Sequence, residues 1–123
     1  MAKTVHDDVL DAALNYIKNN ADYMYACSAQ PTSYAEASST YMLAGVAQTS
    51  SNYTVADGAS GRKVTMAARS DITISNTGTA VYVALVNAGT SKLLYVTTCT
   101  ALYLTAAQLM GFGAWYIQIS DPT

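Results

Sequence analysis

The segment from Asn76 to Cys99, NTGTAVYVALVNAGTSKLLYVTTC, constrains the fold more than any other part of the chain. It contains two apolar runs separated by Asn87-Ala88-Gly89-Thr90-Ser91, a composition typical of turns. In the first run, both sets of alternating positions are apolar, as in a central strand that is covered on both faces. We therefore predict two adjacent β-strands joined by a turn, forming the inner hairpin of a sandwich.

Charged side chains are scarce in this sequence. They make up 11% of the 123 residues, against about 25% in ordinary soluble domains. Between Ile72 and Ser120, Lys92 is the only one. An isolated soluble protein uses charge to stay apart from its neighbours, so this composition suits a subunit that packs against copies or partners. Secreted β-modules can share the same composition.

The charge pattern also excludes classes of partner. The net charge is −2, and Arg62-Lys63 is the only basic cluster, whereas nucleic-acid binding needs several basic contacts to phosphates. The apolar run Ala80–Val86 is far shorter than the roughly 20 residues that span a membrane. The first residues lack an apolar core and soon turn acidic, so we expect no secretory signal.

Residues 1–21 are predicted to contain the single strong helix. We expect it to run from about Val5 to Asn19 with Thr4 as N-cap, because Asp7 follows Thr4 at capping-box spacing. Apolar residues recur at helical spacing and form one stripe: Val5, Val9, Leu10, Ala13, Leu14 and Ile17. The stripe packs either on the β-rich part of the chain or on a neighbouring subunit, and the sequence leaves both open.

Residues 22–123 are predicted to form a β-rich body. About eight short strand-like segments alternate with turn signals, as in antiparallel sandwiches and jelly rolls. The expected strands are Asp22–Ser28, Tyr41–Ala47 with a possible bulge at Gly45, Tyr53–Val55, Arg62–Ser70, Asp71–Ser75, Thr79–Asn87, Lys92–Cys99 and Ala114–Ser120. Ala101–Met110 favours a strand and turn over a helix. The fold class is mainly β, an antiparallel sandwich or jelly-roll-like body with one N-terminal amphipathic α-helix, in a single domain.

No pattern of residues indicates catalysis, a cofactor or a metal site. His6 is the only histidine, and we expect it to be an exposed polar residue. The aspartates within 7–11 suit a solvated acidic first turn better than a cation site. Cys27 and Cys99 are expected to be free thiols rather than a disulfide or metal ligands. We therefore predict a non-enzymatic protein.

Two elements are the candidate contacts with partners: the helix stripe and the polar loop Gln48–Gly61. Long loops of this kind are often functional, and aromatic side chains anchor interfaces. The predicted partner interface consists of Val9, Leu14, Tyr16, Tyr53 and Val55.

Four segments, in order along the chain, carry a family resemblance. They are HDDVLDAALNYIKNNA from His6, GRKVTMAA from Gly61, TGTAVYVALVNAGTSKLL from Thr77 and AWYIQISDPT from Ala114. Together they resemble a group of small virion structural proteins of tailed bacteriophages, over most of the chain. The resemblance implies one helix followed by a β-rich body, and a particle component rather than an enzyme. The chain departs from the pattern in Gln48–Gly61 and Ala101–Met110, the two places where partner contacts can differ.

The leading hypothesis is a capsid decoration (cement) protein, located in the virion and assembled in the bacterial host cytoplasm. Its partners would be the major capsid protein or other virion proteins and further copies of itself, without nucleic acid or membrane. A protein that binds only the assembled lattice stabilises that state. A tail or head–tail connector component is the alternative within the virion. A carbohydrate-binding β-sandwich module that uses tyrosines and Trp115 is the alternative of another class.

Overall fold

The structure, a computed structural model, describes residues 4–121, so Pro122 and Thr123 of the C-terminal motif lie outside the described residues. It is mainly β with several antiparallel sheets and one N-terminal helix, which confirms the predicted fold class. The elements are α1 (Asp7–Asn20), β1 (Tyr23–Cys27), β2 (Met42–Ala47), β3 (Tyr53–Asp57), β4 (Arg62–Met66), β5 (Arg69–Thr73), β6 (Gly78–Asn87), β7 (Lys92–Leu104), β8 (Leu109–Phe112) and β9 (Trp115–Ile119).

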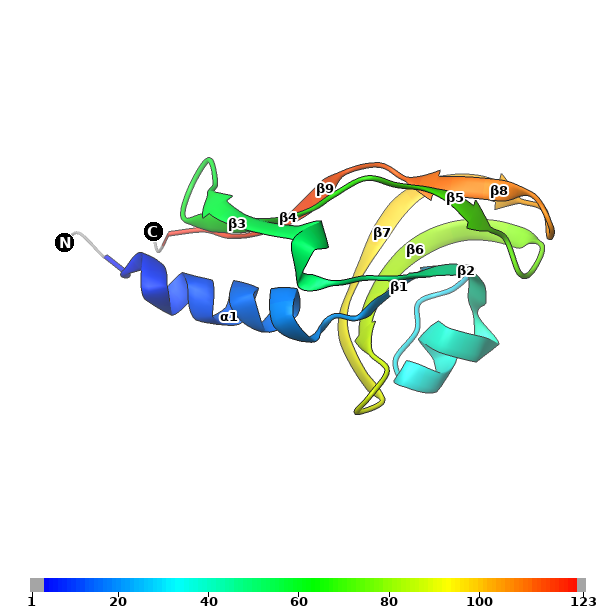
Figure 1. Ribbon diagram of the computed structural model, residues 1–123, viewed down its shortest axis with the longest axis horizontal. Helices are drawn as coiled ribbons and strands as arrows, with labels where there is room; N and C mark the ends of the chain where they lie inside the picture. The colour runs from blue at the N-terminus through cyan, green and yellow to red at the C-terminus, as the bar shows by residue number, and fades with distance from the viewer. Residues whose placement is uncertain (1–3, 122–123) are drawn as a thin grey trace.

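The strands form two layers, as Figure 1 shows. One layer is a four-stranded antiparallel sheet in the order β2-β1-β6-β7. The other is a long ribbon made of the sheets β3-β4-β9 and β5-β8, in which short breaks at Ala67–Ala68 and Gly113–Ala114 separate the two parts. One end of this ribbon lies over the four-stranded sheet and the other end over α1 (Figure 1).

Helix α1 begins later than predicted, at Asp7, and its N-cap is His6 rather than Thr4. The His6 imidazole Nδ1 accepts a hydrogen bond of 3.1 Å from the backbone N–H of Asp8. This bond satisfies one of the backbone donors that the first turn leaves free. The acidic first turn and Lys18 in the last turn both complement the helix dipole.

The buried side of α1 is narrower than the predicted stripe. Leu10 and Leu14 are buried and Ile17 is half-buried, whereas Val9 and Ala13 are exposed. The helix packs on β3 and β4 of its own chain, so the main surface that covers the stripe is intramolecular.

Polar contacts fix the position of α1. The guanidinium of Arg62 in β4 pairs with Asp11, at 2.8 Å from Nε to Oδ1 and 3.2 Å from Nη2 to Oδ2. A third contact of 2.6 Å joins Arg62 Nη1 to Asp57 Oδ1 in β3. The hydrogen bonds from Arg62, first to Asp11 and then to Asp57, raise the pKa of this arginine above its ordinary value. One side chain therefore connects the helix to the β3–β4 hairpin.

The segment Asn76–Cys99, which was predicted to form the inner hairpin, contains one central strand and one edge strand. In β6, Val83 to Val86 are all buried, which confirms a central strand covered on both faces. The second strand, β7, is an edge strand of its sheet, and most of its side chains are half-buried or exposed. The prediction of an inner hairpin is therefore correct for β6 and wrong for β7. The sequence of the hairpin cannot show whether a further strand pairs with the free edge of β7.

The segment Ala101–Met110 forms a strand and a turn, which is the conformation that the sequence favoured over a helix. Strand β7 continues to Leu104, and β8 begins at Leu109. The intervening turn is held by Ile74, whose backbone N–H donates to the Gln108 carbonyl at 2.9 Å and whose carbonyl accepts from Ala107 at 2.9 Å. Ala107 has a φ of 72°, in the left-handed region.

Several other element boundaries differ from those predicted from the sequence. The predicted strand Arg62–Ser70 is divided into β4 and β5, and the polar loop Gln48–Gly61 contains a 3₁₀ turn before β3. The bulge in β2 lies at Leu43, because Ala26 pairs with Ala44 and Cys27 with Met42. Gly45, the predicted bulge, instead lies directly under the Tyr25 ring, where a Cβ would overlap the ring atoms.

Candidate interaction site

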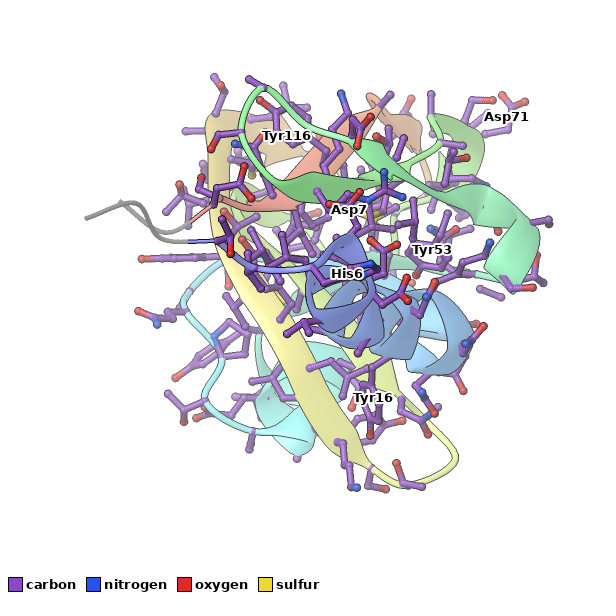
Figure 2. All side chains as sticks on the ribbon, turned by 90° about the vertical axis from the view of Figure 1, so that its left-hand side faces the viewer. His6, Asp7, Tyr16, Tyr53, Asp71 and Tyr116 are labelled. Atoms are coloured by element: carbon purple, nitrogen blue, oxygen red, sulfur yellow. The ribbon has the colours of Figure 1, made fainter. Side chains whose placement is uncertain are left out.

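The five residues of the predicted partner interface do not form one surface. Leu14 and Tyr53 are buried in the core of the chain itself, with 1% and 2% of their surface exposed. Val55 is half-buried and packs against the same core. Val9 and Tyr16 of α1 are exposed, and Figure 2 shows Tyr16 on the side of the helix turned away from β3 and β4.

Tyr53 has a structural contact in this chain. Its hydroxyl donates a hydrogen bond of 2.8 Å to the carbonyl of Ala21, the C-cap residue of α1. Burial raises the pKa of this phenol to about 12, because the charged form would lose its hydration. Tyr53 thereby joins the end of the helix to β3.

The acidic first turn does not form a metal centre in the described chain. Figure 2 places His6 and Asp7 at the exposed N-terminal end of α1. Asp11 points instead toward the β-rich body and pairs with Arg62. Within residues 4–121, no group of three or more histidines, cysteines, aspartates or glutamates is close enough to hold a metal ion.

Both cysteines are free thiols, as predicted. Cys27 in β1 is buried, and its Sγ lies 3.6 Å from the carbonyl of Ala37. Burial raises the pKa of the Cys27 thiol to about 12. Cys99 in β7 is half-buried, and burial also raises its pKa. Neither thiol is activated as a nucleophile, because activation requires a lowered pKa.

A cleft that the sequence does not predict lies between the two layers. It has a volume of about 510 Å³ and separates β7 from β8 and β9; we refer to it as the β7–β9 cleft. Its apolar walls come from Val83 of β6, Leu102 and Leu104 of β7, Met110 and Phe112 of β8, and Trp115 of β9. None of the residues that line it is charged. The volume lies within the range of about 300–1,000 Å³ that is usual for binding sites.

The cleft exposes part of the hydrophobic core. Leu102 lines the cleft beside core residues such as Ala80, its partner on β6, yet 56% of its surface is exposed. Strand β7 pairs with β6 along one edge, and no strand among residues 4–121 pairs with the other edge. The outer edges of β8 and β9 are unpaired in the same part of the chain. The sandwich is therefore open on this side.

Trp115 forms one wall of the cleft and does not offer a free aromatic platform. Its ring stacks on Tyr95 of β7, with ring centroids 6.1 Å apart and an angle of 29° between the planes. Its indole Nε1 is shielded from solvent and has no hydrogen-bond partner among the described residues. Trp115 therefore contributes an apolar ring surface to the cleft and no accessible hydrogen-bond donor.

Large apolar side chains are also exposed on the strands around the cleft. Tyr103 follows Leu102 on β7, and Leu109 begins β8. Tyr116 of β9 lies on the outer face of the upper layer in Figure 2, where the Lys63 ammonium sits 4.9 Å from its ring centroid. The available sequence signal is the alternating apolar pattern of ALYLTAAQLM, which places Leu102 and Leu104 on one face. The pattern cannot show that this face lacks a cover.

Comparisons with known proteins return no match: no protein-family model, curated protein or solved structure is significantly similar to this chain. In the described residues, α1 and the shorter helical turns are too short and too polar to cross a membrane.

Proposed function

We propose that this chain is a non-enzymatic structural protein of a bacteriophage virion, and most specifically a capsid decoration protein that stabilises the assembled head. Several copies bind the outside of the shell and cover joints between subunits of the major capsid protein. The family resemblance of the four sequence segments motivates the virion class.

One observation of the molecule supports this proposal more than any other. The side of the protein built from β6 to β9 carries an open apolar cleft and exposed apolar side chains, while Lys92 is the only charge between Ile72 and Ser120. A chain that stays isolated in solution normally avoids such a surface. A chain that works within an assembly buries it against neighbours.

The physical role follows from linkage. A protein that binds the assembled shell and not the free subunits lowers the free energy of the assembled state by RT ln(1 + [L]/Kd) per site. Such a role needs no catalytic group. It does need a rigid body, which the two-layered core and the Arg62 contacts supply.

The proposal is tested on purified, genome-filled particles of the phage that encodes this chain. We expect quantitative mass spectrometry to find it at a copy number comparable to that of the major capsid protein, and electron microscopy to place it on the head surface. Particles without the chain should lose their genome at a lower temperature, and added purified chain should restore the original value. Absence of the chain from particles overturns the virion assignment.

Location in the particle separates the alternatives. A small, fixed copy number at the tail or the portal vertex would replace decoration by a connector or tail role. The carbohydrate-binding alternative is less favoured by the geometry, because Trp115 is stacked on Tyr95 and its N–H is shielded from solvent. Specific binding of one glycan on an array, lost on replacing Tyr116 or Tyr103, would revive it.

A further inference from the structure

The β7–β9 cleft has the features of a surface that another polypeptide covers. Its wall residue Leu102 belongs to the apolar face of β7 but is 56% exposed. Strand edges with unpaired backbone groups border the cleft on both sides. A peptide strand can satisfy such edges, because its own N–H and C=O groups repeat at the same spacing.

Strand β7 lacks the usual protection of an edge strand. Proteins guard long edges with charges, prolines or a cover, because an unguarded edge pairs with other chains. In its 13 residues, β7 has one charge, Lys92 at its first position, and no proline. Register irregularities interrupt the ladder at Leu94 and again between Thr98 and Leu102. The regular stretch between them, Tyr95–Thr98, is where a further strand can add.

The charge distribution suits a second copy of this chain as the occupant. The remaining charged residues of the described chain lie on α1, on β1 to β5 with their loops, and at Asp121, which leaves β6 to β9 with Lys92 alone. Two copies that meet through these strands bring no like charges together. In an antiparallel, two-fold arrangement the two Lys92 side chains lie at opposite ends of the paired strands. Such isologous contacts are the commonest way in which identical subunits associate.

We propose that two copies of this chain associate through the open side of the sandwich, adding β7 to β7 of the second copy around Tyr95–Thr98 and covering each other's β7–β9 cleft. The contact joins the two four-stranded sheets into one and removes Leu102 from water in both copies. The inference builds on the proposed function, since copies of a decoration protein lie near one another on a shell. It concerns the purified chain alone, however, so it can fail while the virion assignment stands.

The first test is sedimentation equilibrium of the purified chain from about 1 µM to about 1 mM, a range that covers weak to moderate dimers. We expect a monomer–dimer equilibrium. Leu102→Lys should raise the dissociation constant at least about tenfold, because it places a charge on each copy at the contact. Its folding should be unaffected, since Leu102 is more than half exposed, and circular dichroism checks this. Val9→Lys is the matched control, because Val9 is 64% exposed but lies on α1.

The second test uses Cys99, which lines the cleft, as a reporter. Its reaction with a thiol reagent should slow at least about tenfold as wild-type protein is concentrated through the dimerisation range, and should stay fast in Leu102→Lys. Cys27 is buried in the monomer and serves as the internal control in the same sample. A wild-type chain that is monomeric throughout the range overturns the proposal. So does a dimer that Leu102→Lys leaves intact, or one that Val9→Lys disrupts to the same degree.

Discussion

Replacing Leu14 by alanine distinguishes a core residue from an interface residue. Leu14 was expected among the contacts with partners, and the structure buries it to 1% exposure between α1 and the sheet that contains β3 and β4. If the packing is as described, the substitution destabilises the isolated chain. If Leu14 instead faced a partner, the isolated chain would scarcely change.

The expected magnitude follows from the atoms removed. Leucine to alanine deletes three carbons, which at about 0.8 kcal/mol per methylene gives about 2.4 kcal/mol of lost transfer free energy. The space left behind adds to this loss, so measured values for buried leucines fall at about 2–5 kcal/mol. We expect Leu14→Ala to lower the free energy of unfolding by about 3 kcal/mol. A loss of this size corresponds to roughly a 10 °C lower Tm.

Urea denaturation followed by tryptophan fluorescence provides the assay, because Trp115 is the only tryptophan and lies half-buried beside Tyr95. With an m-value of about 1–3 kcal/mol/M, the midpoint should fall by about 1–3 M. Val9→Ala on the same helix is the control. Val9 is exposed, so we expect a change of no more than about 0.5 kcal/mol. A Leu14→Ala variant within about 1 kcal/mol of the wild type would refute the docking of α1 described above.

Three further outcomes are expected. Tyr53→Phe removes the hydrogen bond to the Ala21 carbonyl and leaves that acceptor without its partner, so urea titration should show a loss of about 1–3 kcal/mol. The folded state raises the pKa of the Cys27 thiol from 9.0 to about 12, so it holds this proton more tightly than the unfolded chain. The contribution of Cys27 to stability is therefore complete below about pH 9 and is lost as the pH rises through 12. Tyr25 and Tyr53, whose pKa values burial also raises, are present in both proteins, so the difference between the two proteins reports on Cys27. Between pH 8 and 10, the stability of Cys27→Ala should therefore change less with pH than that of the wild type; parallel slopes would contradict the assignment. Gly45→Ala places a Cβ against the Tyr25 ring and should lower the Tm, and Gly45→Ala combined with Tyr25→Ala should cost less than the sum of the two single changes.

The sequence predicts elements that depend on local periodicity. The apolar positions of α1 recur with the helical repeat, and β6 is apolar on both alternating sets, so both could be identified without the structure. The turn between β6 and β7 follows from residues 87–91, whose side chains favour turns. In each case, neighbours in the sequence determine the conformation.

Features that depend on pairing between distant strands are not available from the sequence. Strand β7 would be a central strand if β8 or β9 paired with its free edge. Instead, β8 pairs with β5 and β9 pairs with β4, so β7 is an edge strand. The cleft arises because that choice leaves Leu102 without a cover. The burial of Tyr53 likewise depends on α1 lying against β3. Spacing along the chain carries no direct signal for any of these contacts.

The pairing of β4 with β9 also bears on how the chain folds. It places Val64 opposite Ile117, so the upper layer joins residues from the middle of the chain to residues near its end. The β6–β7 hairpin can close by itself, but β4 lacks its second neighbour until β9 has been synthesised. Long-range antiparallel pairing of this kind slows folding, because the entropy of closing a large loop is lost before the contacts form. We therefore expect the docking of β9 on β4 to be a late step in folding, which completes the sheet β3-β4-β9.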